Sequence, residues 1–212
     1  TDDEDGISLW KDIKEAAIKG RRTGLGTHGL ADVFLALGLR YDSEDAEKLA
    51  DKIYYTHMIA SYDASMDLAE ERGPFPIWDY NIDMQCPFIR NLGEERLARL
   101  KRTGRRNIAN TTLAPTGSVA IASRSSSGME SVFRWVYDRF IKNSDEMFPV
   151  DRVDVVGDKW TKFRVVHPAV EEYFKINGIE CPIKGGRDFA LPIDEANKVI
   201  QKMLPEIGRA SV

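Results

Sequence analysis

The apolar residues of this chain follow a helical spacing over roughly its first half and then change to shorter, mixed patterns. Residues 8–19 and 44–72 each place apolar side chains on one face of a helix, and Ser43 is a suitable N-cap for the longer of the two. Residues 94–103 are expected to form a short helix that ends at Gly104. Residues 1–104 are therefore expected to be mainly helical.

The second half mixes strand and helix signals. Residues 105–142 are expected to form a strand, a turn and a second strand, with both strands inside Thr111–Ala122. Residues 151–166 alternate apolar and polar side chains around Gly157-Asp158, which is typical of a β-hairpin. Residues 150–212 are therefore expected to fold as a hairpin followed by helices. By pattern alone the fold class is mixed α and β, rich in helix.

Three glycines have the spacing of a dinucleotide-binding fingerprint. Gly24, Gly26 and Gly29 follow the charged end of a predicted helix, whereas the fingerprint should follow a strand. We interpret these glycines as positions of close helix packing.

Composition narrows the classes of function. With 212 residues, 42% hydrophobic and 30% charged, the chain is long enough to bury a real core. Its net charge of −4 provides no overall field that would favour nucleic acid. No apolar run is long enough to span a membrane. We therefore expect neither nucleic acid nor a membrane as a partner.

The cysteines and the termini suggest the setting of the chain. Cys86 and Cys181 form neither a disulfide framework nor a metal motif, and they fit a reducing cytoplasm, which is the predicted location. The first residues lack the features of a signal peptide. The chain stops at Arg209–Val212 without a closing element, so both ends look cut and a fragment of a longer protein is expected.

The most informative motif is a turn between two short apolar runs. It consists of Pro115, Thr116, Gly117, Ser118 and Val119. Gly117 has no Cβ, so the main chain can approach a ligand closely, and Thr116 and Ser118 add hydroxyl donors. Successive N–H groups in a tight turn suit a phosphate, but most turns of this composition bind nothing. The residues Pro-Thr-Gly-Ser alone leave both interpretations open, and no P-loop Gly-Lys-Thr or Gly-Lys-Ser follows.

Two further features lie near this turn in the sequence. A second polar loop, Ser125–Glu130, follows a few residues later, and the two loops are expected to meet at one end of a barrel or sheet. A basic cluster precedes the turn. It contains Lys101, Arg102, Arg105 and Arg106. The cluster fits either a solvated helix end or electrostatic support for a nearby phosphate.

Several blocks together resemble the large catalytic subunit of ribonucleotide reductases. Arg105–Val119 is similar to the family's Arg-Asn segment and its Thr-Ile-Ala-Pro-Thr-Gly-Thr/Ser run, and Ser126–Ser131 to Ser-Ser-Gly-Ile-Glu-Pro, with Met and Ser in place of Ile and Pro. Arg21–Asp32 resembles a third family block. Val156–Trp160 and Val165–Pro168 look like a segment of the adenosylcobalamin-dependent, class II members. The resemblance covers roughly residues 8–178.

This resemblance implies the fold and the role of the chain. It implies a segment of the ten-stranded α/β barrel of ribonucleotide reductases, so that 1–212 is one fragment of the catalytic barrel domain. It carries Pro115–Val119 onto the family's phosphate-binding turn. The implied substrate is a ribonucleoside di- or triphosphate, the implied partner is the remainder of the reductase chain, and the implied cofactor of the parent enzyme is adenosylcobalamin, not held by this fragment alone.

The family's radical chemistry needs a cysteine that this sequence does not supply. The thiyl cysteine of the family sits in an Asn-x-Cys-x-Glu motif, and neither Cys86 nor Cys181 has those neighbours. No catalytic and no metal-binding residue is therefore predicted. The parent would be an oxidoreductase that makes deoxyribonucleotides for DNA synthesis, and the isolated chain is expected to be inactive.

Two alternatives stay open at the level of sequence. The chain could be a standalone nucleotide- or phosphate-binding module on a reductase-derived scaffold. It could also be a structural interaction domain on the same scaffold, with the aromatic segment 77–92 as its contact surface.

Overall fold

The computed structural model of the protein describes residues 4–144 and 147–204. Three stretches lie outside the described part: residues 1–3, 145–146 and 205–212. The predicted unfinished end at Arg209–Val212 therefore also lies outside the described residues.

The chain divides into two compact units. The first comprises residues 1–26 and 49–114, and the second comprises residues 27–48 and 115–212. Each unit has a hydrophobic core of its own. That residues 1–212 belong to one domain stays a prediction.

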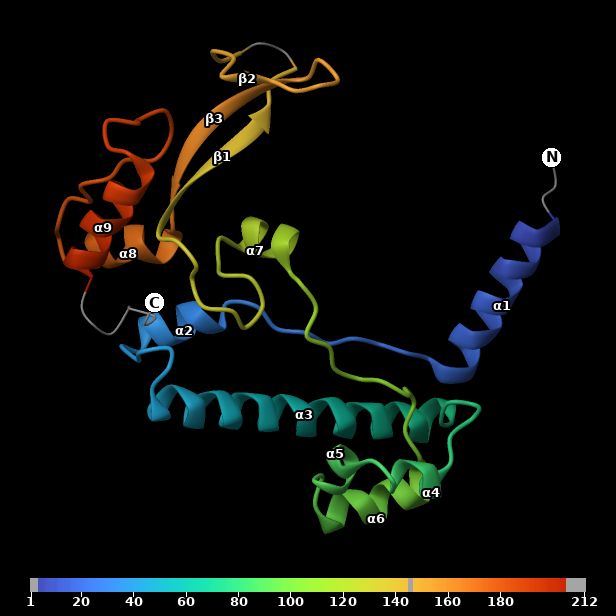
Figure 1. The fold of residues 1–212 in the computed structure, drawn as a ribbon. Coiled ribbons are helices and arrows are strands. Elements are labelled where there is room, and N and C mark those ends of the chain that lie inside the picture. Colours follow the sequence, from blue (N-terminus) through green and yellow to red (C-terminus); the bar gives the residue numbers. More distant parts are fainter. Residues whose placement is uncertain (1–3, 145–146, 205–212) are drawn as a thin grey trace. The chain divides into compact units, whose positions relative to one another are not determined.

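Helices dominate the first unit and the segment that links it to the second (Figure 1). They are α1 (Glu4–Gly20), α3 (Glu44–Arg72), α4 (Tyr80–Asp83), α5 (Pro87–Arg90) and α6 (Glu94–Thr103). The mainly helical character predicted for residues 1–104 is confirmed. Ser43 caps α3 as expected, since its hydroxyl accepts the Ala46 N–H at 3.2 Å.

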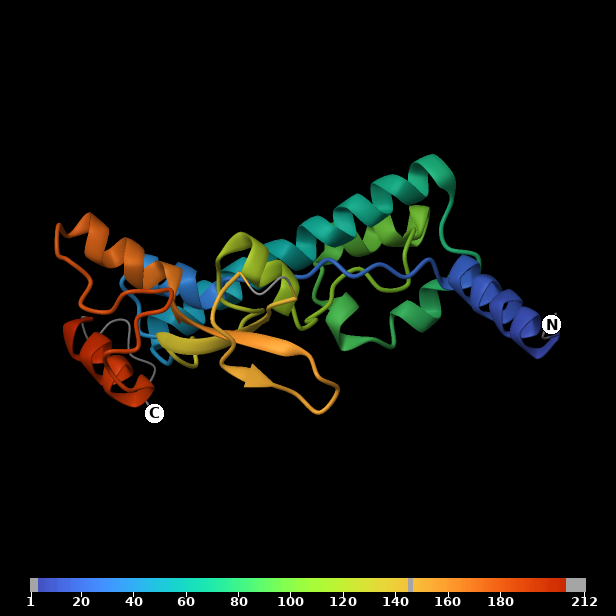
Figure 2. The same cartoon turned by 90° about the horizontal axis from the view of Figure 1, so that it is seen from above.

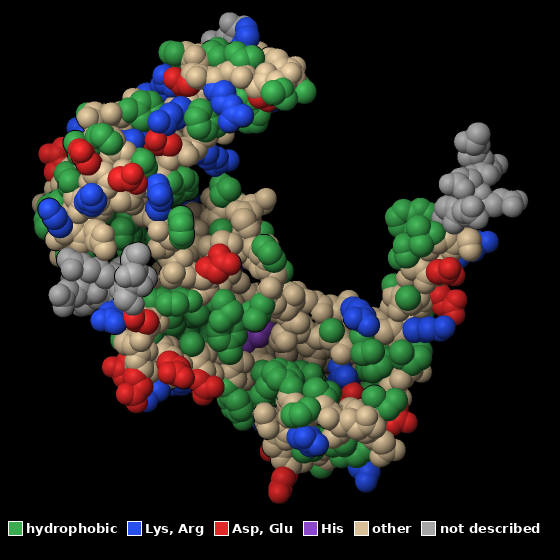
Figure 3. All heavy atoms as spheres, in the orientation of Figure 1, with side chains coloured by type: hydrophobic (Ala, Val, Ile, Leu, Met, Phe, Trp, Pro, Cys, Tyr) green, Lys and Arg blue, Asp and Glu red, His purple; other side chains and the backbone are tan. Residues whose placement is uncertain are grey.

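Helix α1 keeps its apolar side chains at the surface. Leu9, Trp10, Ile13 and Ile18 are exposed by 57%, 70%, 47% and 50% respectively, and green side chains lie along this helix in Figure 3. The apolar face that predicts helix 8–19 is therefore not covered by any described residue.

The core of the first unit forms where α3 meets α5 and α6. Its buried residues are Met58, Tyr62, Met66, Ile89, Leu92 and Leu100. Beside this core, Arg105 and Asp83 form an ion pair of 2.7 Å with side chains only 5% and 6% exposed. The Trp78 indole N–H also donates to Asp83, at 3.0 Å.

The basic cluster is neither wholly a solvated helix end nor wholly an electrostatic support for a phosphate. Arg105 is buried against Asp83, and the Arg106 guanidinium donates to the carbonyls of Arg72 and Gly73 at 2.7 and 2.9 Å. Lys101 and Arg102 are exposed at the end of α6. The two inner arginines therefore hold the main chain of the first unit in place.

Two of the three glycines lie where extended segments pair. Leu25 and Thr111 form an isolated parallel bridge. A Cβ on Gly24 would come within 2.9 Å of Thr112 Cγ2, and one on Gly26 within 3.2 Å of the Thr112 carbonyl oxygen. The predicted close packing of helices is therefore wrong at Gly24 and Gly26, because the close approach there is between two extended segments.

The second unit contains a three-stranded antiparallel sheet with the order β1-β3-β2 (Figure 2). The strands are β1 (Val136–Lys142), β2 (Arg152–Val153) and β3 (Lys159–Val166). The hairpin predicted within 151–166 is confirmed as β2 and β3, but the longer pairing runs from Val136–Val166 to Lys142–Trp160 between β1 and β3.

Four helices accompany this sheet. They are α2 (Leu30–Ala36), α7 (Gly117–Ser123), α8 (Pro168–Ile176) and α9 (Ile193–Met203). Helices α8 and α9 confirm the helices expected after the hairpin. The mixed α and β class is confirmed.

The strand–turn–strand prediction for residues 105–142 is wrong in its second half. Gly117–Ser123 is a short helix, bounded by Thr116 at its start and by Arg124 in the left-handed conformation (φ 55°) at its end. A short apolar run such as this one does not distinguish strand from helix by its spacing, and the residues at its two ends decide. The first predicted strand is reduced to the single bridge at Thr111.

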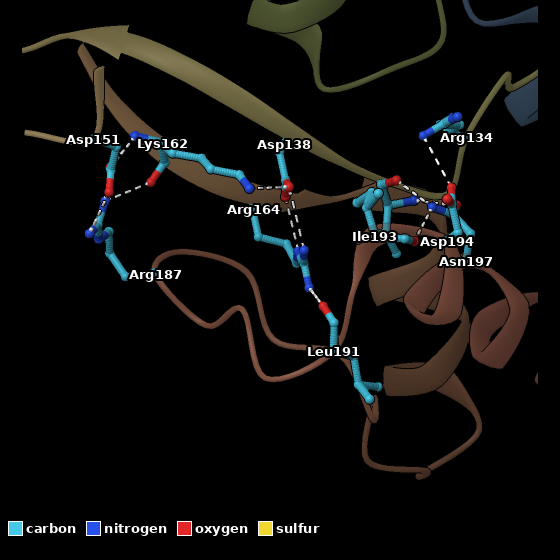
Figure 4. Close-up of polar contacts among 11 residues, drawn as sticks. Arg134, Asp138, Asp151, Lys162, Arg164, Arg187, Leu191, Ile193, Asp194 and Asn197 are labelled. Carbon is cyan, nitrogen blue, oxygen red and sulfur yellow. Dashed lines mark hydrogen bonds and ion pairs between the residues drawn. The ribbon is translucent and has the colours of Figure 1, made fainter. Parts of the chain in front are cut away.

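The core of the second unit packs α8 and α9 against one end of β1 and β3. Its buried residues are Val136, Val166, Val170, Phe174, Ile183, Ala196, Ile200 and Leu204. Figure 4 shows the polar contacts that fasten this arrangement. The Asn197 side chain accepts the Val136 N–H at 3.0 Å and donates to its carbonyl at 2.7 Å.

A second polar group in Figure 4 lies on β1 and β3. Arg164, whose side chain is 3% exposed, donates to Asp138 at 3.0 Å and to the Leu191 carbonyl at 2.5 Å. Burial alone would raise the pKa of Asp138, but hydrogen bonds from Arg164 and Lys162 lower it below its usual value. These contacts tie the sheet to the segment before α9.

Candidate functional site

The predicted Pro115–Val119 turn is the entry into helix α7. Thr116 precedes the first helical residue, and its carbonyl accepts the Ala120 N–H at 2.7 Å. The N–H groups of Gly117, Ser118 and Val119 come before that first helical hydrogen bond, and they have no acceptor within the described ranges. All three residues are exposed. The structure thus places three consecutive donors at the surface.

The Thr116 hydroxyl does not cap this helix. A threonine at this position ordinarily accepts an N–H of the first turn through its side chain. Here Oγ1 instead accepts the Gly128 N–H at 2.8 Å and lies 3.3 Å from Ser127 Oγ. Ser127 Oγ also accepts the Thr116 N–H at 3.3 Å. The Thr116 hydroxyl therefore binds the second loop, and it does not cap the N–H groups in the first turn of α7.

The second polar loop, Ser125–Glu130, meets the turn, but at the start of helix α7 and not at the predicted end of a barrel or sheet. The contacts of Thr116 with Ser127 and Gly128 join them directly. The element between the two loops is helix α7, however, and not the short strand that the sequence suggests.

The start of helix α2 holds this loop from the other side. Gly29, with φ 81°, donates its N–H to the Ser126 carbonyl at 3.0 Å. The Asp32 carboxylate accepts the Ser126 N–H at 2.6 Å. Both backbone groups of Ser126 are thus bound by the first turn of α2.

A histidine and two hydroxyls extend the polar surface. His28 Nδ1 lies 2.9 Å from Ser125 Oγ and 3.5 Å from Ser123 Oγ, and the two serine oxygens are 2.9 Å apart. His28 and Ser123 are exposed. This hydrogen-bonded group links the end of α7 to the segment before α2.

His167 lies behind the second loop and is 7% exposed. Its Nδ1 accepts the Ala169 N–H at 3.3 Å, and its Nε2 lies 3.6 Å from the Asp32 carboxylate. Burial lowers the pKa of His167, and the nearby negative charge of Asp32 partly opposes this effect. Burial therefore favours the neutral imidazole, and the Asp32 Oδ1 atom that faces Nε2 has no hydrogen-bond partner among the described residues.

A pocket of about 270 Å³ opens next to this arrangement. Its polar lining comes from the second loop and the residues around it: Ser125, Ser126, Ser127, Glu130, Arg134 and His167. Phe133 adds a ring that is 92% exposed. Ser127 belongs to the pocket and also contacts Thr116, so the pocket and the turn share a wall.

Gly117 has open space around its α-carbon. A Cβ built there meets nothing within 4 Å, and the φ of Gly117 is not in the left-handed region. The fold of the described residues therefore does not require glycine at this position. A requirement for glycine would have to come from a bound group.

No local sequence pattern groups Asp32, Ser126 and His167. Each lies in a block that carries the family resemblance, but the three blocks are far apart in the chain. One local signal was available for His167, because a histidine before Pro168 can serve as an N-cap. Its proximity to Asp32 follows only from the fold.

The two cysteines are free thiols. Cys86 is exposed before α5, and Cys181 is half-buried with its thiol 3.2 Å from the Ile183 carbonyl oxygen. Burial raises the pKa of Cys181, which keeps it a protonated and less reactive thiol. Among the described residues, no cluster of side chains could hold a metal ion.

Comparison with known families agrees with the motif blocks. A family model described as ribonucleotide reductase, barrel domain, matches residues 7–158, which is more than half of the chain. This chain belongs to the ribonucleotide reductase barrel-domain family. The resemblance predicted from the sequence is thereby confirmed.

Relatives of this reductase segment include enzymes of bacteria, archaea and viruses. The vitamin B12-dependent ribonucleoside-diphosphate reductase of Mycobacterium tuberculosis (strain CDC 1551 / Oshkosh) is 36% identical over 131 residues, covering 61% of this chain and 16% of the relative. The reductase of the same name from Thermoplasma acidophilum is 32% identical over 139 residues, 66% of this chain and 16% of the relative. The ribonucleoside-diphosphate reductase large subunit of Ostreid herpesvirus 1 is 30% identical over 61% of this chain and 17% of its own length.

The reductase segment thus spans about a sixth of the length of these relatives. Among solved structures, the class Id ribonucleotide reductase alpha subunit of Actinobacillus ureae matches 77% of this chain and 22% of its own, with 21% identity and a TM-score of 0.46. No helix in the described part of the segment is long and apolar enough to cross a membrane.

Proposed function

We propose that this segment binds the phosphate groups of a ribonucleotide in a ribonucleotide reductase, through Pro115, Thr116, Gly117, Ser118 and Val119. The observation that carries the proposal is that the Thr116 hydroxyl binds Gly128 and Ser127 and does not cap α7, while the N–H groups of Gly117, Ser118 and Val119 have no acceptor among the described residues. Such N–H groups at the start of a helix favour an anion, and Ser118 adds an exposed hydroxyl.

The proposed role is to hold the substrate in place. Phosphate contacts at the turn would fix one end of the nucleotide and leave its ribose free to reach reacting groups elsewhere in the enzyme. Binding energy from a part of the substrate that does not react is thereby converted into orientation at the carbon that does. The pocket beside Ser127 gives the uncharged part of such a ligand room next to the turn.

The parent protein, on this proposal, is an oxidoreductase that converts ribonucleotides to deoxyribonucleotides with a thiyl radical. Several of its relatives are named ribonucleoside-diphosphate reductases, which favours a diphosphate substrate. The partner of this segment is then the remainder of the reductase chain. Because the sequence lacks an Asn-x-Cys-x-Glu motif, the segment alone is inactive.

Adenosylcobalamin is the proposed cofactor of the parent enzyme, since two relatives are named vitamin B12-dependent. When bound, this group supplies the radical. The pocket of about 270 Å³ is far smaller than a corrinoid, and the described residues offer no fit for one. We therefore assign the cofactor site to parts of the reductase outside this chain.

Three wider features belong to the same proposal. Residues 1–212 would be one piece of the ten-stranded α/β barrel domain, in which the extended segments around Leu25 and Thr111 are paired strands. The location would be the cytoplasm, as two free cysteines suggest. Neither nucleic acid nor a membrane would be a partner.

Calorimetric titration of the 212-residue chain with ribonucleoside di- and triphosphates tests the phosphate site. We expect micromolar binding by the wild type and none by Gly117→Asp, because a carboxylate at the first helical residue repels the phosphate. Ala122→Asp places the same charge at the exposed far end of α7 and should bind like the wild type. Equal binding by Gly117→Asp and Ala122→Asp would contradict the proposal, and no binding by the wild type would favour a purely structural segment.

A further inference from the structure

We propose that Asp32 is a positioning residue for the Pro115–Val119 turn, acting through the backbone of Ser126. The inference rests on the proposed phosphate-binding function, and Asp32 has no hydrogen bond to the turn itself among the described residues. Asp32, on helix α2, is linked to the turn by three consecutive residues of the second loop.

The first link is the hold of α2 on Ser126. The Asp32 carboxylate accepts the Ser126 N–H at 2.6 Å, and the Gly29 N–H donates to the Ser126 carbonyl at 3.0 Å. A hydrogen bond to a carboxylate is shorter and stronger than one between neutral groups. Ser126 itself is 7% exposed, so its backbone has little access to water as an alternative partner.

The second link joins the next two residues to the turn. Ser127 Oγ accepts the Thr116 N–H at 3.3 Å, and Gly128 donates its N–H to Thr116 Oγ1 at 2.8 Å. Thr116 is the residue from which α7 begins, so its orientation sets the direction of the three free N–H groups. A shift of Ser126 would move Ser127 and Gly128, and with them Thr116.

His167 restricts the position of Asp32 from a third element. Its Nε2 lies 3.6 Å from Asp32 Oδ1, and that oxygen has no hydrogen-bond partner among the described residues. The backbone N–H of His167 donates to the Trp135 carbonyl at 2.7 Å, and its ring Nδ1 accepts the Ala169 N–H. The imidazole is therefore fixed at both its backbone and its ring, and it confines the carboxylate between α2 and the start of α8.

The arrangement differs from an ordinary acidic residue in the first turn of a helix. Such a residue stabilises its own helix through the helix dipole, and Asp45 at the start of α3 is an exposed example in the same unit. Asp32 additionally binds a backbone group that is distant in sequence. Removing the carboxylate should therefore change the environment of Gly128 and Thr116, which Asp32 does not contact.

Amide hydrogen exchange measured by NMR on the 212-residue chain, without ligand, tests this link. In Asp32→Ala we expect the Gly128 and Thr116 amides to exchange about tenfold faster than in the wild type, as after the loss of one charged hydrogen bond. Asp32→Asn keeps an acceptor without the charge and should give a smaller increase. Asp45→Asn removes a comparable charge and should leave both amides unchanged.

Unchanged exchange of Gly128 and Thr116 in both Asp32 variants would overturn the inference, whatever the chain binds. A second titration, with inorganic pyrophosphate, separates the inference from the proposed function. The wild-type chain should bind pyrophosphate, and Asp32→Asn should bind it more weakly. If the double variant with Thr116→Val binds pyrophosphate no more weakly than Asp32→Asn alone, the link to the phosphate turn is supported. If the wild type does not bind pyrophosphate but the exchange rates respond to Asp32, the phosphate site fails and the positioning of the turn by Asp32 stands.

Discussion

At the scale of single residues, Gly117 separates a requirement of the fold from a requirement of a ligand. A Cβ at this position meets no atom within 4 Å, and the backbone is not left-handed. We expect Gly117→Ala to leave the free energy of unfolding unchanged or to raise it by up to about 1 kcal/mol, because alanine restricts the unfolded chain. Nucleotide binding should become roughly tenfold weaker, since the methyl group keeps phosphate from the main chain.

Urea unfolding and calorimetry on the same Gly117→Ala sample check this prediction. The prediction requires that nucleotide binding weakens while the free energy of unfolding does not fall. A variant that loses stability and binding together would show that glycine is needed by the fold.

The buried ion pair of Arg105 and Asp83 is a second residue-scale test. Both side chains are nearly inaccessible, and Arg105 also donates to the carbonyls of Asn107 and Ile108 at 2.7 and 2.8 Å. Asp83→Ala leaves the guanidinium buried without its counter-charge, so we expect a loss of about 3–5 kcal/mol in unfolding free energy. The exposed pair of Lys19 and Glu15 is the control.

Glu15→Ala should leave the free energy of unfolding nearly unchanged, since exposed ion pairs contribute little. Denaturant unfolding measures both variants. Similar small losses for Asp83→Ala and Glu15→Ala would contradict the role of the buried pair.

At the scale of elements, His167 is the N-cap of helix α8, and its burial disfavours the charged form of the imidazole. Burial lowers the pKa of His167, with Asp32 acting in the opposite direction. The native state therefore binds fewer protons here than the unfolded chain does. The contribution to stability is complete above the unfolded pKa of about 6.5 and is lost as the pH falls from there through the lower pKa of the folded state.

We expect the unfolding free energy of the wild type to fall more steeply between pH 7 and pH 5 than that of His167→Asn. Asparagine is a good N-cap and can accept the Ala169 N–H, but it does not titrate. Unfolding curves across this pH range decide the matter. Parallel pH profiles for the two proteins would refute the assignment.

The attachment of helix α9 to strand β1 gives another element-scale prediction. Asn197 bonds both the N–H and the carbonyl of Val136, a residue that is 0% exposed. Asn197→Ala leaves these buried backbone groups without partners, at a cost of about 1–3 kcal/mol in unfolding free energy. Asn177→Ala removes an exposed hydrogen bond to the Tyr173 carbonyl and should change stability by only a few tenths of a kcal/mol. Thermal unfolding compares the two, and an equal effect would count against a fastening role for Asn197.

At the scale of the whole molecule, the proposed division of labour predicts binding without turnover. The 212 residues contain no Asn-x-Cys-x-Glu motif, and their two thiols are an exposed Cys86 and a half-buried Cys181 of raised pKa. Incubated with a ribonucleoside diphosphate, adenosylcobalamin and a dithiol, the chain should form no deoxyribonucleotide. Chromatography of the nucleotides measures this, and measurable product would show that the reductive chemistry needs no further part of the enzyme.

The sequence by itself determined the longer helices and the family, whereas the short helix α7 was wrongly predicted as a strand. The N-cap Ser43 and a long helical spacing predicted α3, and Gly104 marked the end of the predicted helix 94–103, because these signals are local. The blocks around Gly24 and Pro115 were sufficient for the reductase family, as the match over residues 7–158 confirms. Recognising these blocks needed no knowledge of tertiary contacts.

Only the tertiary structure decided how these blocks are joined. The run after Thr116 is too short for its spacing to separate helix from strand, and contacts of Thr116 with Ser127 and Gly128 set the start of α7. The hold of Asp32 on Ser126 and the burial of His167 depend on residues far apart in the chain. Local patterns cannot encode such contacts, since they arise when separate elements pack, and the proposed phosphate turn depends on them.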